Sequence, residues 1–380
     1  MSTEPASGHA STLVTQEMDG GGPTPVGRRL AEWRKRRGLA VASLATRAGL
    51  PEQLIEDLEA GRDWVDQRHV LSSLATGLRL DPAELTGQPY MPCGADHCTV
   101  HSLGWHVRRH LARVFSADGA VAEANREQLA VLVDGLRAAD DGGDLVSAVL
   151  KVPPLLELAS PPQAGEADRE VAVLRAAAHT AVGRLLRRLG YWDLAWSVLS
   201  QACPPAARPA VLGEEVRLLL DMGQAELAVA RAAGAAGVTA EVLLTVAIAH
   251  AALGHEAESE RLLAVVQDKA VGPQQRSEAA SAGAFAAAER GAFDQVLDRA
   301  AGTACLPVGD RAGLLVLTAS ARARLGRYGA AAEDLAAAES IAPLHTRLDP
   351  LARELVSVLL AHGDEHAEVL GGIAARFGMK

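Results

Sequence analysis

Five glycines in the second half of the chain recur at nearly constant spacing and constrain the fold more than any other feature. Gly190, Gly223, Gly254, Gly291 and Gly326 are separated by 33, 31, 37 and 35 residues, a mean of 34. Each follows an apolar stretch ending in a sequence such as RRLG or ARLG, and each precedes a second stretch with alanines at its small-residue positions. Small residues let paired helices approach closely. The spacing therefore predicts an array of helical hairpins, each folded at its glycine.

A mean period of 34 residues is that of the tetratricopeptide repeat (TPR). The segment ASARARLGRYGAAAEDLAAAESIAP, which ends at Pro343, resembles the TPR consensus most closely. The segment from HTRLDPLARELVSVLLAHG onward is predicted to be a terminal cap. We therefore predict a TPR-like helical repeat domain over residues 105–380, with C-terminal capping helices. The alternative is a generic alanine-rich bundle, because periodic glycine turns arise in any array of helical hairpins.

Composition narrows the class of protein. Aromatic residues make up only 3% of the chain, and Ala, Leu, Val, Arg and Glu dominate, which predicts an all-α fold. The net charge of -10 argues against wholesale binding of polyanions but permits a small basic module on an acidic body. The cysteines give no disulfide framework, which is typical of a reduced cytoplasmic protein. They are Cys93, Cys98, Cys203 and Cys305.

The hydropathy of the sequence predicts neither a membrane-spanning segment nor an export signal. Residues 1–24 lack the basic and apolar regions of a signal peptide, so we expect a disordered leader. The longest apolar run, VLLTVAIAHAALG, is about half the length of a membrane span. We therefore expect no membrane association and a cytoplasmic location.

Short helical segments replace the repeat pattern before residue 90. They read PVGRRLAEWRKRRG, AVASLATRAG, PEQLIEDLEAG, RHVLSSLATGLRL and DPAEL, and each ends at or near a glycine or a turn. This pattern predicts a small N-terminal helical bundle over residues 25–88. The following segment, TGQPYMPCGADHC, is punctuated by glycine and proline and predicts a linker over residues 89–104.

LAEWRKRRGL, LATRAGL and IEDLEAG occur in the order and at the spacing of the lambda-repressor-like helix-turn-helix. Residues 25–88 resemble this XRE family over about a sixth of the chain. In the helix-turn-helix arrangement, Leu44 and Ala45 pack against Ile55 and Leu58 while Gly49 supplies the turn between the two helices.

The segment that corresponds to the DNA-reading helix, GLPEQLIEDLEAG, carries four acids and no basic residue. The resemblance implies that Glu59 forms a structural ion pair with Arg34. It also implies that the base-reading candidates are Glu52, Gln53 and Asp57. A carboxylate can accept a hydrogen bond from cytosine N4 but repels nearby phosphates.

Basic side chains precede and follow this helix. Residues 28–37 hold six of them against Glu32 alone, a local charge of +5. Phosphate contacts supply most of the affinity for DNA, and base contacts supply the specificity. A solvated helix face is the alternative explanation for the basic run. Our phosphate-contact candidates are Arg34, Lys35, Arg36, Arg37, Arg62 and Arg68.

Two positions depart from the family pattern at the start of the motif. Ala40 stands where the family usually has a Ser or Thr helix cap, a loss worth about 1 kcal/mol of helix stability. Val41 stands where the family usually has a polar phosphate contact. We therefore expect weak binding by a monomer and dependence on two copies at a two-fold site.

An XRE-type domain followed by a TPR-like body resembles helix-turn-helix regulators of actinobacteria. The resemblance implies a homodimeric transcriptional regulator that binds double-stranded DNA at an inverted repeat. Its body would serve dimerisation and sense a peptide, a small molecule or a partner protein. Arg184, Arg187 and Arg217 are candidates on the concave surface, although we expect them to belong to a solvated helix face. The alternative function is a TPR protein-interaction adaptor whose helix-turn-helix has lost DNA binding.

The chain shows no pattern that demands a cofactor. Cys93, His97, Cys98 and His101 are zinc-ligand types within nine residues, but no second Cys/His pair follows at finger distance. We therefore predict no metal centre, and keep these four residues as the candidates for one. The motifs of nucleotide-binding loops, serine hydrolases and zinc proteases are missing from the sequence, so we expect no enzymatic activity.

Overall fold

The computed structural model describes residues 22–92, 94–116, 126–159, 169–201, 208–235, 238–362 and 366–379. All regular elements within these ranges are helices, which confirms the predicted all-α class. No helix in the described ranges is both long and apolar enough to cross a membrane. Of the leader predicted over residues 1–24, residues 1–21 lie outside the described residues.

A bundle of five helices forms the N-terminal domain. Its centre is made by Leu30, Leu44, Ile55, Leu58 and Leu74, each from the apolar face of a short helix and each fully buried. The helices are α1 (Pro25–Arg36), α2 (Val41–Ala48), α3 (Glu52–Glu59), α4 (Arg68–Leu78) and α5 (Pro82–Thr86).

The first helix of the domain is held tightly at its N-terminus. The Thr24 side chain accepts a hydrogen bond from the backbone N–H of Gly27 at 3.3 Å and so caps α1. A Cβ atom at Gly27 would lie 2.1 Å from the carbonyl oxygen of Leu58. Only glycine therefore allows α1 to lie this close to the end of α3.

Five helical hairpins build the body, as the glycine spacing predicted. Each of the five repeat glycines has a positive φ, between 70° and 80°, and joins two helices of one hairpin. The pairs are α10 (Arg169–Arg188) with α11 (Trp192–Gln201), α12 (Arg208–Asp221) with α13 (Ala225–Ala233), α14 (Ala240–Ala252) with α15 (Glu256–Lys269), α16 (Pro273–Glu289) with α17 (Phe293–Ala300), and α18 (Val308–Arg324) with α19 (Tyr328–Ile341).

The first helices of successive hairpins pack against one another, which gives the body its TPR-like solenoid form. Helix α16 shows why they lie inside: Ala282, Ala284 and Ala286 are buried along with most of its other residues, because the helix has neighbours on several sides. Helix α17, in contrast, fully buries only Val296 and lies on the outside of the array.

Further helices close both ends of the body. At one end are α6 (Ala95–Ser116), α7 (Arg126–Asp141), α8 (Leu145–Leu150) and α9 (Val152–Leu158), and at the other α20 (Pro343–Leu348), α21 (Pro350–His362) and α22 (Ala367–Arg376). Helix α6 begins at Ala95, inside the segment predicted as a linker. The glycine and proline residues mark only the extended part of that segment. Val100, Leu103 and Val107 are buried and follow a helical spacing, which the prediction of a linker did not take into account.

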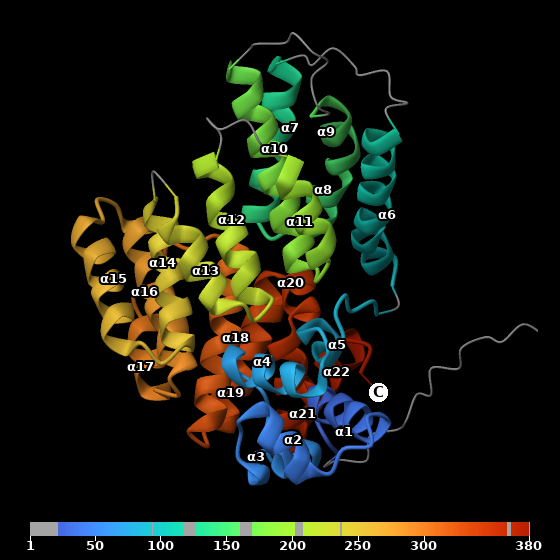
Figure 1. The fold of residues 1–380 in the computed structure, drawn as a ribbon, viewed down its shortest axis with the longest axis vertical. Helices are drawn as coiled ribbons and strands as arrows, with labels where there is room; N and C mark the ends of the chain where they lie inside the picture. Colours follow the sequence, from blue (N-terminus) through green and yellow to red (C-terminus); the bar gives the residue numbers. More distant parts are fainter. Residues whose placement is uncertain are drawn as a thin grey trace, which may run out of the picture.

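The N-terminal domain lies against the C-terminal helices of the body (Figure 1). The backbone N–H of Val26 donates to the Glu354 carboxylate at 2.8 Å, and the Arg353 guanidinium donates to the carbonyl oxygen of Thr86 at 3.0 Å. Arg353 also stacks on the Tyr90 ring, 4.0 Å from its centroid. Both ends of the small domain are therefore fixed to α21.

Candidate nucleic-acid interface and central cavity

The helix-turn-helix motif consists of α2, a turn at Gly49 and α3. Gly49 has a φ of +66°, and the backbone N–H of Leu50 donates to the carbonyl oxygen of Ala45 at 3.1 Å, so the chain reverses as the sequence predicted. Helix α2 begins at Val41 with no side-chain cap from Ala40, which was also predicted. The residues predicted to pack between the two helices all belong to the buried core of the domain: Leu44, Ala45, Ile55 and Leu58.

The three base-reading candidates lie on the outer face of α3. Glu52 and Gln53 are exposed in its first turn, where a carboxylate is favoured by the helix dipole. The Gln53 amide donates to the Asp57 carboxylate at 3.0 Å, and the Arg62 guanidinium donates to the same carboxylate at 2.7 Å. The hydrogen bond from Arg62 lowers the pKa of Asp57. One acid of the reading helix is therefore already paired with an exposed arginine.

A second acid of α3 is also paired. Glu59 accepts two hydrogen bonds from Arg34, one of them at 2.6 Å, and both side chains are only 13% exposed. The remaining Arg34 nitrogen donates to the carbonyl oxygen of Leu39 at 2.8 Å. The hydrogen bonds with Glu59 raise the pKa of Arg34. The predicted structural pair is present, and it holds the Arg34 guanidinium inside the domain rather than at its surface.

The structure separates the other phosphate-contact candidates into two groups. Lys35, Arg36, Arg37 and Arg62 are exposed. Arg68 instead faces the body, where its guanidinium and its backbone N–H both donate to the Glu289 carboxylate, at 2.6 and 2.9 Å.

One exposed basic residue of the motif was absent from the sequence-based candidates. Arg47 lies in the last turn of α2 and is exposed. The helical spacing gave no clear signal for it, because a residue three positions after the buried Leu44 lies near the same side of the helix.

Arg324 of α18 fastens the loop between α3 and α4 to the body. Its guanidinium lies 3.7 Å from the centroid of the Trp64 ring, and its Nε donates to the Asp66 carboxylate at 2.8 Å. The Asp63 carboxylate accepts a further hydrogen bond from the same guanidinium. Burial alone would lower the pKa of Arg324, but the charges of Asp66 and Asp63 raise it. The loop after the reading helix is thus held by a paired, partly buried cation.

A cavity of about 570 Å³ lies in the body, a size that suits a small organic ligand or a short peptide segment. Its walls come mainly from the first helices of the hairpins, α10, α12, α14, α16 and α18, and from α20. Arg68, the first residue of α4, also lines it. The cavity is therefore the concave side of the repeat array, and the N-terminal domain contributes to its wall.

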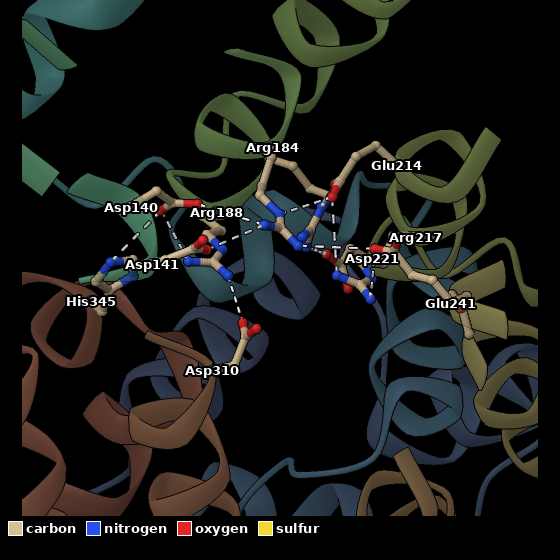
Figure 2. A network of polar contacts seen from close by, with 12 residues as sticks. Asp140, Asp141, Arg184, Arg188, Glu214, Arg217, Asp221, Glu241, Asp310 and His345 are labelled. Carbon is tan, nitrogen blue, oxygen red and sulfur yellow. Dashed lines mark hydrogen bonds and ion pairs between the residues drawn. The ribbon is translucent and has the colours of Figure 1, made fainter. Parts of the chain in front are cut away.

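Arginines and carboxylates form a network along one side of this cavity (Figure 2). Arg187 is only 10% exposed and donates to Glu214 at 3.0 Å and to Asp221 at 2.6 Å. Burial would raise the pKa of Glu214, but the charges of Arg187, Arg217 and Arg184 lower it to about 2. The three arginines named from the sequence do line the cavity. Their interpretation as a solvated face is wrong, because they are largely buried and paired with acids.

The four candidate metal ligands do not come together among the described residues. His97 and His101 lie one turn apart on α6 and face the body, whereas Cys98 is exposed, and Cys93 lies outside the described residues. His101 Nδ1 lies 3.0 Å from the Tyr191 hydroxyl. Within the described ranges no group of three or more His, Cys, Asp or Glu side chains is arranged to hold a metal ion.

Comparison with known proteins supports the assignment of the N-terminal motif. A family model described as a helix-turn-helix domain matches residues 25–86, so this part of the chain is a helix-turn-helix domain. No curated protein matches the sequence. Among solved structures, PlcR from Bacillus thuringiensis in complex with the peptide PapR7 and DNA is similar over 86% of this chain and 99% of its own, at 11% identity and a TM-score of 0.28.

Proposed function

We propose that the chain is a transcriptional regulator that binds DNA as a homodimer at an inverted repeat, and that its body serves dimerisation and ligand sensing. The observation that carries the proposal is the orientation of the helix-turn-helix domain. Its α1, α4, α5 and α3–α4 loop contact the body, while the outer faces of α2 and α3 are left exposed. The part of the motif that reads DNA is the part that the body does not cover (Figure 1).

The exposed face offers a specific mode of recognition. Glu52 and Gln53 lead the reading helix, where Glu accepts from cytosine N4 and Gln pairs with adenine. Arg62 stands beside Asp57 and offsets part of the acidic charge that would repel the phosphates. Lys35, Arg36 and Arg37 supply exposed positive charge for backbone contacts.

The cavity is the proposed sensor, for a peptide, a small molecule or a segment of a partner protein. Arg68 connects it to the DNA-binding domain, because the side chain lines the cavity and the residue is the first of α4. Asp221, another residue of the cavity wall, lies 3.8 Å from the Arg68 guanidinium. A ligand that alters the pairing of Arg68 therefore acts directly on the position of the helix-turn-helix domain.

Selection of bound fragments from a random DNA library by the purified full-length protein tests the proposal. The expected result is an enriched inverted repeat. The triple variant Lys35→Gln, Arg36→Gln, Arg37→Gln should bind the enriched site more weakly, with a salt dependence reduced by about 0.9 in log–log slope for each lost phosphate contact. The matched control is Arg108→Gln, Arg109→Gln, Arg113→Gln, which removes three charges that are also exposed, from α6 in the body.

Two outcomes oppose the proposal. If no sequence is enriched, with or without extract of the source cell, the adaptor alternative holds and the helix-turn-helix is an interaction surface. If the α1 triple variant and the α6 control lose equal affinity, the binding is nonspecific attraction to the whole protein rather than contact by the motif.

A further inference from the structure

The cavity looks at first like an anion site, because arginines are numerous in its wall. They are Arg68, Arg184, Arg187, Arg188 and Arg217. Each of them lies within ion-pair distance of at least one carboxylate. Arg187 and Arg188 are only 10% and 16% exposed, so their charges are balanced by carboxylates of the protein itself.

The carboxylates of the same wall outnumber the arginines by six to five. They are Asp141, Asp221, Glu241, Glu278, Asp310 and Asp349. Asp140, Glu214 and Glu289 bind the arginines as well and add to the negative charge. Asp141 and Glu241 are 53% and 49% exposed and lie 3.9 Å from Arg184, and Glu241 also lies 3.3 Å from Arg217. The formal charge in and around the cavity wall is therefore negative, which favours a cation.

Two helices of the wall change from acidic to apolar side chains along their length. On α14, Glu241 is followed on the cavity side by Leu244 and Ile248, and on α16, Glu278 is followed by Ala282 and Phe285. As first helices of successive hairpins, the two run in the same direction, so both acids lie toward one end of the cavity and both apolar side chains toward the other. On each helix the acid and the further apolar residue are seven positions apart, which corresponds to a rise of about 10 Å.

Helix α18 repeats this arrangement, with Asp310 before Val316 along the cavity wall. Near Asp310, across Arg188 (Figure 2), lies a buried polar group that has no hydrogen-bond partner among the described residues. It is Nε2 of His345, whose side chain is 8% exposed and lies 3.9 Å from Asp140. Burial and the charge of Arg188 lower the pKa of His345 to about 3. A neutral imidazole in this position is able to accept a hydrogen bond from a ligand N–H group.

We propose that the central cavity binds an amphipathic cation, an ammonium or guanidinium group attached to an apolar body about 10 Å long. The cationic group lies against the carboxylates of Glu241 and Asp141, which are about half exposed, and of Asp310, which is paired with Arg188. The apolar body lies along Leu244, Ile248 and Phe285. This inference rests on the proposed sensing role of the body and names the chemical class of ligand for it.

Direct binding to the full-length protein tests the inference without DNA, so its failure and failure of DNA binding are separate results. The probes are 4-phenylbutylamine, 4-phenylbutyrate and 4-phenylbutanol, which share one apolar body and differ in charge. Ligand-observed NMR titration measures the three dissociation constants. The amine is expected to bind with a Kd on the order of 1 mM, as its size allows, and at least about tenfold more tightly than the acid.

Two variants locate the site. Glu241→Gln combined with Asp310→Asn should weaken the amine by about tenfold or more and leave the alcohol nearly unchanged. The control is Glu258→Gln on α15, an acid of 40% exposure that is paired with Arg261 outside the cavity. Circular dichroism establishes that the variants remain folded.

The source of the natural ligand is addressed by a second pair of probes. Acetyl-Leu-Phe-Lys-Leu-amide and its Glu counterpart offer the same cation and anion on a peptide. Tighter binding of the lysine peptide than of the amine supports a peptide ligand, and the reverse supports a small amine. Preference for either anion, equal binding of the charged probes, or no binding of any probe at about ten times the expected Kd overturns the inference.

Discussion

The buried carboxyl group of Glu354 should make the contact between the body and the helix-turn-helix domain sensitive to pH. Its side chain is fully buried on α21, and one carboxylate oxygen accepts from the backbone N–H of Val26, while the other has no hydrogen-bond partner in the part of the chain that the structure describes. Burial raises the pKa of Glu354 from 4.5 to about 7, against the opposing effects of Thr24, Val26 and Arg353. The folded protein thus holds a proton on this group that the unfolded chain releases at lower pH.

The sign and size of the effect follow from that difference in pKa. Because the folded state binds the proton more tightly, the contribution to stability is complete below pH 4.5 and is lost as pH rises toward 7. At about 1.36 kcal/mol per pKa unit, the loss amounts to roughly 3 kcal/mol. Glu354→Gln keeps an oxygen acceptor for Val26 but carries no charge. The variant should match the wild type near pH 4.5 and exceed it by roughly 3 kcal/mol above about pH 8.

Urea denaturation of both proteins at a series of pH values measures this difference. Other groups titrate over the same range, but they are common to both proteins and cancel when one free energy of unfolding is subtracted from the other. A difference that stays constant with pH would refute the reasoning, since it would show that the Glu354 carboxyl has the same pKa in the folded and unfolded states. A difference that grows toward low pH would show that the folded state favours the ionised form.

Two further predictions concern the body. Gly223 and Gly254 have φ values of +73° and +76°, so alanine at either should cost about 1–2 kcal/mol in urea denaturation. Gly223→Ala should cost about 1–3 kcal/mol more than Gly254→Ala, because the new Cβ would lie 2.9 Å from Ser72 of the helix-turn-helix domain. At Gly254 no atom beyond its chain neighbours lies within 4 Å of the corresponding position in the described part of the chain. Equal costs for the two variants would argue against the contact with Ser72. Glu214→Gln should cost roughly 3 kcal/mol at pH 7, because the charged carboxylate has a pKa of about 2 against 4.5 unfolded. That cost should shrink as pH falls from 4.5 toward 2, and a cost independent of pH would show that the carboxylate charge contributes nothing.

The candidate DNA-binding residues show the limit of reasoning from position in the sequence. Arg34 and Arg68 belong to the same set of basic residues as Lys35 and Arg62, but their carboxylate partners lie 25 and 221 residues away along the chain. The partner of Arg34 followed from a family resemblance. Nothing in the local pattern around Arg68 indicates Glu289, because that pair exists only where the small domain meets α16.

The sequence by itself determined the helical class, the two-part organisation and the hairpin turns. These properties depend on local chemistry: apolar residues at helical spacing, and glycines where a left-handed conformation ends one helix before the next. The orientation of the helix-turn-helix domain and the excess of carboxylates around the cavity were decided by tertiary structure. Both depend on which charges are paired across segments far apart in the chain, and the count of arginines alone gave the opposite impression of that surface.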